Sequence, residues 1–358
     1  MGSTVLLGNT VGAKDTKGEA KTVGNSIFLF GVFSVILMLI LLLFTSEITA
    51  LMQTPEEAYR DTVQYLAICF AGIPFIMAYN VISSIFRGLG DSRTPMYFVA
   101  VACVINIALD YIFIGGMGLG AAGAALGTIL SQAVSSATAF IVIKKRKFDF
   151  SLSRRDLFPD RTTIGRILTV GSPVALQDGL IQVSFLAITT IANGRGLVAA
   201  AAVGVVEKII SFLFLVPSAL LSAISAITAQ NMGAGKRQRA ERTLGYGLVL
   251  AAVSGLFFSV FCQVYPDVLV GLFNKEPAIL AAGCQYLRSY SFDCLFAGVH
   301  FCFSGYFCGR GQSYISFIHN IASILLMRIP GAWLASVYYP ETLYPMGWAA
   351  PANRQSKE

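Results

Sequence analysis

Long apolar runs, separated by short polar loops, dominate this chain. Each run is close to the roughly 20 helical residues that cross the hydrocarbon core of a bilayer. The pattern predicts an all-α polytopic membrane protein, because helices satisfy their backbone hydrogen bonds internally. After a short apolar segment at Ser3–Val11, the expected spans are Ile27–Phe44, Val63–Phe86, Pro95–Gly115, Ala121–Ile143, Ile167–Ala192, Ala199–Ala229, Thr243–Val264, Ile279–Phe307 and Ile315–Tyr338.

Two polar residues interrupt the run Pro95–Gly115. Asn106 and Asp110 are four residues apart, so they project from one helix face, roughly 6 Å apart along its axis. A carboxylate at membrane depth is costly unless it faces protein or water, which makes Asp110 a functional candidate. The structural alternative is an acid that reaches the interface near a helix end, with Asn106 bonding to a neighbouring helix. Position alone leaves both interpretations open.

Composition supports a membrane protein and narrows the function classes. The chain is 55% hydrophobic and only 13% charged, whereas soluble domains contain about 25% charged residues. Its seven cysteines lack metal-ligand spacing, and the two histidines, His300 and His319, are isolated in the sequence. We expect these histidines to pack in the core. Hydrolase motifs such as HExxH and GxSxG are absent, so the sequence predicts neither an enzyme nor a cofactor.

The net charge of +7 reflects topology. Basic residues gather in alternate loops, which the positive-inside rule places in the cytoplasm. No nucleic-acid role is therefore needed to explain the charge. The other loops carry few basic residues, chiefly Arg195 and Lys275, together with the acids Glu47, Glu56, Glu57, Asp267, Glu276 and Glu341. The longest basic segment, Lys144–Arg166, is the predicted linker between a helix bundle at 1–143 and a second bundle at 167–358.

Similar strings recur 221 residues apart. The separation pairs Gln64-Tyr65-Leu66 with Gln285-Tyr286-Leu287, and Gly88 with Gly309. Such a parallel repeat is typical of secondary transporters. The counterpart of Pro173 would fall before Met1, and the counterpart of Gly120–Ile143 would run past Glu358. We therefore expect both bundles to be incomplete, without the first helix and most of the last.

Four segments resemble motifs of the multidrug and toxic compound extrusion (MATE) family: RGLGDSRTP at Arg87–Pro95, NIALD at Asn106–Asp110, GLGAAGAALGT at Gly118–Thr128 and AQNMGAGK at Ala229–Lys236. The resemblance implies two pseudo-symmetric helix bundles that export cationic or amphipathic compounds by alternating access. H+ or Na+ would enter in exchange. It also implies a multi-pass protein of the plasma membrane, in bacteria the cytoplasmic membrane, and we expect a monomer in the lipid bilayer.

The resemblance also implies a coupling-ion site in the first bundle. Asp110 and Asn106 match the family's acid and amide, Thr128 its hydroxyl and Tyr65 its phenol. A buried carboxylate can take a proton near neutral pH, and oxygen ligands suit Na+, which Asp110 and Asn106 would hold. The family places a further Asp on its first helix, which this chain lacks, so ion coupling stays open.

A possible second cation or substrate site lies in the second bundle. Asp178 with Gln177, and Asp293, resemble more loosely an acidic pair of another branch of the family, and Glu207 adds a further intramembrane acid. Arg288 could instead pair with Asp293 as a structural ion pair. Aromatic residues such as Tyr290 are expected to face lipid or the interface.

Two other functions remain. The first is a related flippase for lipid-linked saccharides, for which a strongly cationic cleft would be expected. The second is a truncated membrane protein without transport activity. The acids of the candidate sites favour cation-coupled export over the flippase.

Overall fold

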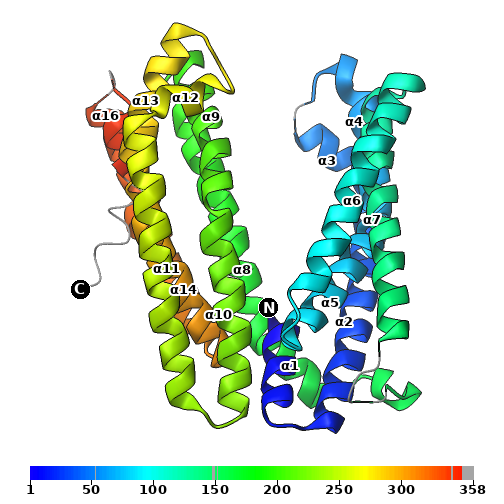
Figure 1. Ribbon diagram of the computed structural model, residues 1–358. Coiled ribbons are helices and arrows are strands. Elements are labelled where there is room, and N and C mark those ends of the chain that lie inside the picture. Colours follow the sequence, from blue (N-terminus) through cyan, green and yellow to red (C-terminus); the bar gives the residue numbers. More distant parts are fainter. Residues whose placement is uncertain (53, 147–149, 151, 340–341, 349–358) are drawn as a thin grey trace. The chain divides into compact units, whose positions relative to one another are not determined.

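All regular elements in the described part of the computed structural model are helices (Figure 1). The structure describes residues 1–52, 54–146, 150, 152–339 and 342–348. The chain divides into two compact units, Leu6–Leu168 and Met1–Val5 together with Thr169–Glu358. Glu341 and the polar C-terminus, where the repeat predicts an incomplete last span, lie outside the described residues.

The first unit is built around α7, which contacts α4, α5 and α6, while α2 packs on α5. Small residues on α7, such as Gly123 and Ala125, are buried against these neighbours. This agrees with the preference for small residues at helix interfaces in membranes. Its elements are α1 (Gly2–Gly12), α2 (Thr16–Leu43), α3 (Thr45–Leu51), α4 (Glu56–Ala71), α5 (Ile73–Gly88), α6 (Arg93–Asp110), the π-helix η1 (Tyr111–Gly116), α7 (Gly120–Lys145) and the 3₁₀ turn η2 (Arg154–Leu157).

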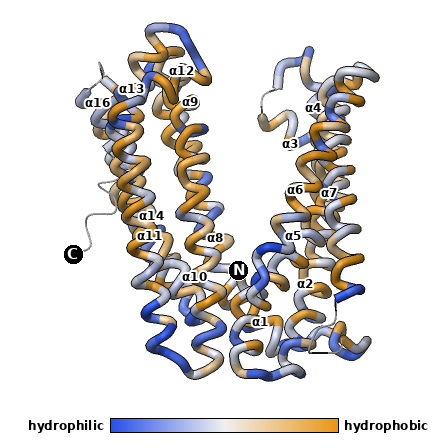
Figure 2. Tube along the Cα trace, viewed as in Figure 1, coloured by the Kyte–Doolittle hydropathy of each residue, from blue (hydrophilic) through white to orange (hydrophobic). Residues whose placement is uncertain are grey.

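In the second unit α14 packs against both α10 and α11. Glycines allow the close approach: a Cβ at Gly309 would lie 2.6 Å from Thr228 Cβ and 2.7 Å from the Ser225 carbonyl oxygen. Polar residues gather at the α10–α11 turn, while the helices themselves are largely apolar (Figure 2). The elements are α8 (Arg161–Asn193), α9 (Leu197–Leu213), α10 (Leu215–Gly233), α11 (Arg237–Val264), α12 (Pro266–Gly271), α13 (Pro277–Tyr290), α14 (Asp293–Gly309), α15 (Ser313–Ser323), the π-helix η3 (Ile324–Arg328) and α16 (Ile329–Tyr338).

The predicted fold class, an all-α membrane protein, is confirmed. Seven helical segments in the described part are long and apolar enough to cross a membrane. An eighth is added if α4 and α5, bent by 41° at Gly72, form one span. The run expected at Ile279–Phe307 forms two helices, α13 and α14, instead of one.

The break between α13 and α14 has a local cause. The hydroxyl of Ser291 donates to the carbonyl oxygen of Arg288 (2.7 Å), a side-chain bond that competes with the helical backbone bond. Gln263 on α11 donates to the same carbonyl at 2.7 Å. A neighbouring helix thus satisfies a backbone group that the break has freed, as membrane proteins require.

The 221-residue repeat extends to the helix boundaries. Six pairs of boundaries differ by this number: the ends of α1 and α10, the starts of α2 and α11 and their ends, the starts of α3 and α12, the starts of α4 and α13, and the ends of α5 and α14. Residues with positive φ follow the same register, Lys14 (57°) with Gly235 (70°) and Gly90 (88°) with Gly311 (76°). The segments from the end of α1 to the end of α5 and from the end of α10 to the end of α14 therefore repeat the same succession of helices and turns.

The basic connector is attached to the N-terminal end of α2. The side chain of Asn25, fully buried, accepts a hydrogen bond from the backbone N–H of Asp160 (2.7 Å) and donates to the carbonyl oxygen of Asp156 (3.3 Å). Hydrogen bonds from Thr163 lower the pKa of the Asp160 carboxyl, with a smaller contribution from Lys21 at 3.5 Å. Connector residues 147–149 and 151 lie outside the described part.

A second polar clamp joins the α5–α6 turn to the end of α7. Asp91 accepts hydrogen bonds from the backbone and hydroxyl of Thr94 (3.0 and 2.7 Å) and forms an ion pair with Arg146. The Arg146 guanidinium also lies 5.3 Å from the ring centroid of Phe86. Desolvation raises the pKa of Asp91, but the bonds from Arg146 and Thr94 outweigh it and lower the pKa to about 2.

Candidate functional site

Asp110 and Asn106 lie together at the end of α6. Asn106 Nδ2 donates to Asp110 Oδ1 at 3.4 Å, and both side chains are half-buried. The π-helix η1 begins at the next residue, Tyr111. Single-turn π-helices occur frequently at functional sites, because the extra residue disturbs regular backbone bonding. The i, i+4 arrangement predicted from the sequence is therefore present beside an irregular helix.

The absence of a side chain at Gly127 on α7 leaves room for the Asp110 carboxylate. A Cβ at Gly127 would lie 2.2 Å from Asp110 Oδ1 and 3.5 Å from the Asp110 backbone nitrogen. A side chain at this position would therefore displace the carboxylate oxygen. Gly127 was not among the predicted site residues, although it directly precedes Thr128 in the motif GLGAAGAALGT.

Thr128 and Tyr65 have other partners. Thr128 is exposed on α7 and donates to the Ala124 carbonyl oxygen at 3.0 Å. Tyr65 on α4 is 40% exposed, with its phenol beside the Cys69 thiol one turn along. Among the described residues neither side chain contacts Asp110, so of the four predicted site residues the structure brings together Asp110 and Asn106.

In the second unit Glu207 belongs to a buried polar cluster. The hydroxyl of Thr189 on α8 donates a hydrogen bond to the Glu207 carboxylate and lies 3.2 Å from each of its two oxygens. The buried phenol of Tyr286 has Glu207, Arg328 and Asp293 as charged neighbours. Asp293, at the start of α14, is 1% exposed. Two of the predicted acids, Glu207 and Asp293, therefore both act electrostatically on the Tyr286 phenol.

Asp178 is not part of this cluster. It is exposed on α8, next to the buried Gln177, and its electrostatic neighbours are the amino group of Met1 and the Cys308 thiol. The suggested pairing of Asp178 with Asp293 is therefore not seen in these contacts.

Arg328 is a functional candidate that the sequence analysis missed. It is 6% exposed, and its Nη2 donates to the Tyr290 hydroxyl at 3.0 Å. The signal was available, since Arg328 is the only Lys, Arg, Asp or Glu in the run Ile315–Tyr338. Tyr290 is 1% exposed, so the expectation that it faces lipid or the interface is wrong.

The alternative of a structural ion pair between Arg288 and Asp293 is not seen. Arg288 is exposed, and it is absent from the ion pairs of the described residues: Lys21–Asp160, Arg146–Asp91 and Arg237–Glu241. The two histidines, which are far apart in the sequence, lie together: α14 and α15 stack His300 on His319 with ring centroids 5.0 Å apart.

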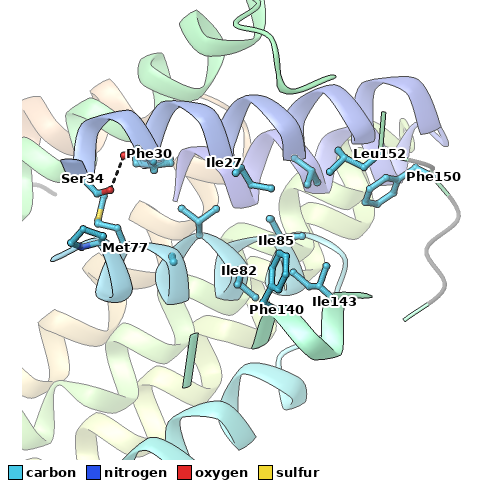
Figure 3. A pocket seen from close by; sticks show the side chains of 15 residues that line it. Ile27, Phe30, Ser34, Met77, Ile82, Ile85, Phe140, Ile143, Phe150 and Leu152 are labelled. Carbon is cyan, nitrogen blue, oxygen red and sulfur yellow. Dashed lines mark hydrogen bonds between the residues drawn. The ribbon is translucent and has the colours of Figure 1, made fainter. Parts of the chain in front are cut away.

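An apolar pocket lies in the first unit. It measures about 380 Å³ and lies between α2, α5, α7 and connector residues 150 and 152 (Figure 3). Ser34 is the one hydroxyl among its described lining residues, and it donates to the Gly31 carbonyl oxygen (2.8 Å). The lining offers no charged group, so this pocket does not supply an ion site.

The MatE family model matches residues 1–112 and 173–334. The chain belongs to the MATE family of membrane transporters. Membership confirms the predicted family and places this multi-pass protein among transporters instead of enzymes.

Similar proteins, including some of known structure, align with most of the length of this MATE protein. "Probable multidrug resistance protein YpnP" of Bacillus subtilis is 32% identical over 335 residues, 92% of this chain and 75% of the relative. "Probable multidrug resistance protein YoeA" of the same organism is 29% identical, over 94% of this chain and 74% of the relative. A crystal structure of MATE in complex with MaL6 has a TM-score of 0.94 at 23% identity and covers 99% of this chain and 80% of its own.

Proposed function

We propose that this protein exports amphipathic or cationic compounds across the bacterial cytoplasmic membrane in exchange for H+ or Na+. The family and the multidrug-resistance names of the bacterial relatives support export of several compounds. The acids of the candidate sites in the first and second units favour cations over anions as coupling ions. Alternating access between two conformations would let ion and compound compete for the same states.

Asp110 is proposed as the residue that binds the coupling ion. The observation that carries the proposal is its carboxylate at the end of a membrane helix, held between Asn106 and Gly127. A carboxylate in such a place can hold a proton, or can share Na+ with the amide oxygen of Asn106. Glu207 and Asp293 are proposed as a second cation or substrate site. Thr128 and Tyr65 would join the first site only in another conformation.

The test is dye export from lipid vesicles that contain the purified chain. A pH gradient and a Na+ gradient are imposed separately, and wild type is compared with Asp110→Asn. We expect one of the gradients to drive export and Asp110→Asn to abolish the coupling, because the neutral amide cannot bind the ion. Unchanged gradient-driven export in Asp110→Asn would refute the ion site. Movement of a fluorescent lipid-linked saccharide without dye export would favour a flippase. The absence of both dye export and saccharide movement would refute the export proposal.

A further inference from the structure

A small chamber is enclosed within the second unit, where α8, α14, α15 and η3 meet. Its volume is about 50 Å³. Three phenylalanine rings contribute to its lining, and the remaining side chains are mostly polar or basic. The lining residues are Ile181, Phe185, Phe214, His300, Phe301, His319, Asn320, Ser323 and Arg328.

Arg328 gives the chamber a fixed positive charge. Its guanidinium lies 4.4 Å from the ring centroid of Phe185, and Nη2 donates to the Tyr290 hydroxyl. Its Nε is buried and makes no hydrogen bond within the described residues. Arginine remains charged at every physiological pH and presents five donors in a plane. The Nε–H group of this buried cation therefore lacks an acceptor among the described residues, although a buried charge is stable only when it is paired and hydrogen-bonded.

The two histidines are also part of the lining. Their rings are stacked at 29°, and the buried Nδ1 of His319 has no hydrogen-bond partner in the described structure. Imidazole takes a proton near neutral pH, and both nitrogens of the protonated ring are donors. Arg328 and a protonated histidine would thus present donors to the same small space.

The nearest acids do not neutralise the chamber by direct contact. Glu207 on α9 interacts electrostatically with Arg328 but accepts its hydrogen bond from Thr189, and no ion pair joins it to Arg328 among the described residues. The other titratable groups around Arg328 and the histidines are Asp293 at the start of α14, Tyr286 and Tyr290 on α13, and, farther along α8, Asp178.

We propose that this chamber binds a small monovalent anion, either a halide or the carboxylate group of a small acid. The anion would accept hydrogen bonds from Arg328 and from protonated His319 and lie against the positive edges of the aromatic rings. The volume holds one small ion but not a drug-sized compound. Because binding favours the protonated histidine, anion and proton bind together. This inference does not depend on the export proposal.

The test uses the purified chain in detergent with sodium bromide, sodium acetate or sodium gluconate at constant ionic strength. Gluconate is too large for the chamber and serves as the reference salt. We expect bromide or acetate to raise the thermal unfolding midpoint, and the affinity to be at least about tenfold higher near pH 6 than near pH 8. A response to acetate alone would identify a carboxylate, and a response to bromide alone a halide.

Variants separate this site from general salt effects. Arg328→Gln should abolish the anion response, and His319→Gln should abolish its pH dependence. Exposed Arg288→Gln is the matched control and should behave as wild type. Because Arg328→Gln could fail to fold, anomalous scattering from bromide-soaked crystals of the unaltered protein gives a second measurement. A bromide or acetate response that persists in Arg328→Gln, no response to either salt, or bromide bound only outside the chamber would overturn the proposal.

Discussion

Replacing Gly127 with alanine would place a methyl group where the Asp110 carboxylate now lies. The new Cβ would be 2.2 Å from Oδ1 and 3.4 Å from Cγ, so only the carboxylate oxygen clashes. Nonbonded carbon and oxygen atoms pack at about 3.4 Å or more, and Oδ1 must therefore move by about 1 Å. The change tests the position of the acid while its chemistry is kept.

The displacement should affect ion binding far more than stability. Asn106 Nδ2 is already 3.4 Å from Oδ1, so a shift away from α7 readily breaks that bond. A hydrogen bond to a charged group contributes about 1.5–3 kcal/mol and stabilises the ionised carboxylate, so its loss corresponds to roughly a tenfold or greater change of ion affinity. An off-rotamer Asp110 would cost about 0.5–1.5 kcal/mol, which the gain of about 1 kcal/mol from Gly to Ala in a helix offsets.

The assay is gradient-driven dye export in vesicles, measured over a series of coupling-ion concentrations. Gly127→Ala should shift the half-saturating ion concentration at least about tenfold and leave the maximal rate less affected. The shift should be upward for Na+, because the acid and the amide that would share it are separated, and downward for H+, because the ionised carboxylate loses its Asn106 donor. Its unfolding midpoint in detergent should stay close to that of wild type. Gly245→Ala on α11 is the matched control, since a Cβ there meets nothing within 4 Å.

Two results would contradict this reasoning. An unchanged ion dependence in a folded Gly127→Ala protein would show that the carboxylate position does not set ion affinity. A large loss of stability would show that the clash cannot be relieved by rotating one side chain.

Three more predictions concern stability, measured as unfolding in detergent. Asn25→Ala should lower the free energy of unfolding by about 1–3 kcal/mol, because two connector backbone groups lose their buried partner. An unchanged free energy would contradict a stabilising role of these two hydrogen bonds. Gly309→Ala should cost about 1–3 kcal/mol by forcing α14 away from α10, whereas Gly245→Ala should stabilise by up to about 1 kcal/mol; equal effects would refute close packing. The pKa of Asp91 is lower in the folded protein than its unfolded value of about 3.9, so the ionised carboxylate stabilises the fold above that pH. Wild type should therefore lose stability as the pH falls from about 4 to 2. The loss should be at most about 1 kcal/mol, because solvent screens this ion pair. Asp91→Asn, which removes the ion pair with Arg146, should abolish that part of the pH dependence.

Local and repeated features were predictable from the sequence. Apolar runs identified nearly all the spans, because bilayer thickness sets their length. The contact of Asn106 with Asp110 followed from helix geometry, since residues four apart share a face. The repeat also gave the correct register for helix boundaries, as the starts of α2 and α11 show.

Contacts between distant segments were not predictable in the same way. His300 and His319 are 19 residues apart and meet because a turn at Gly311, with φ of 76°, returns α15 along α14. Neither residue marks that contact in the sequence. Gly127 was missed for a related reason: its importance comes from an atom on another helix, and a glycine carries no chemical group to attract attention.

The repeat conserves helices and turns but not the chemistry of the sites. The position 221 residues after Asp110 is Gly331, and the counterpart of Asp293 in the first half is Gly72, where α4 gives way to α5. Both acids nevertheless lie where a helix is interrupted, Asp110 before a π-helix and Asp293 at a break. Irregular backbone inside a membrane is tolerated only where protein or water satisfies it, and the same surroundings lower the cost of a carboxylate. The two acids therefore lie at different interruptions: the break at Asp293 has its counterpart at Gly72, whereas the counterpart of the π-helix after Asp110 lies within the regular helix α16.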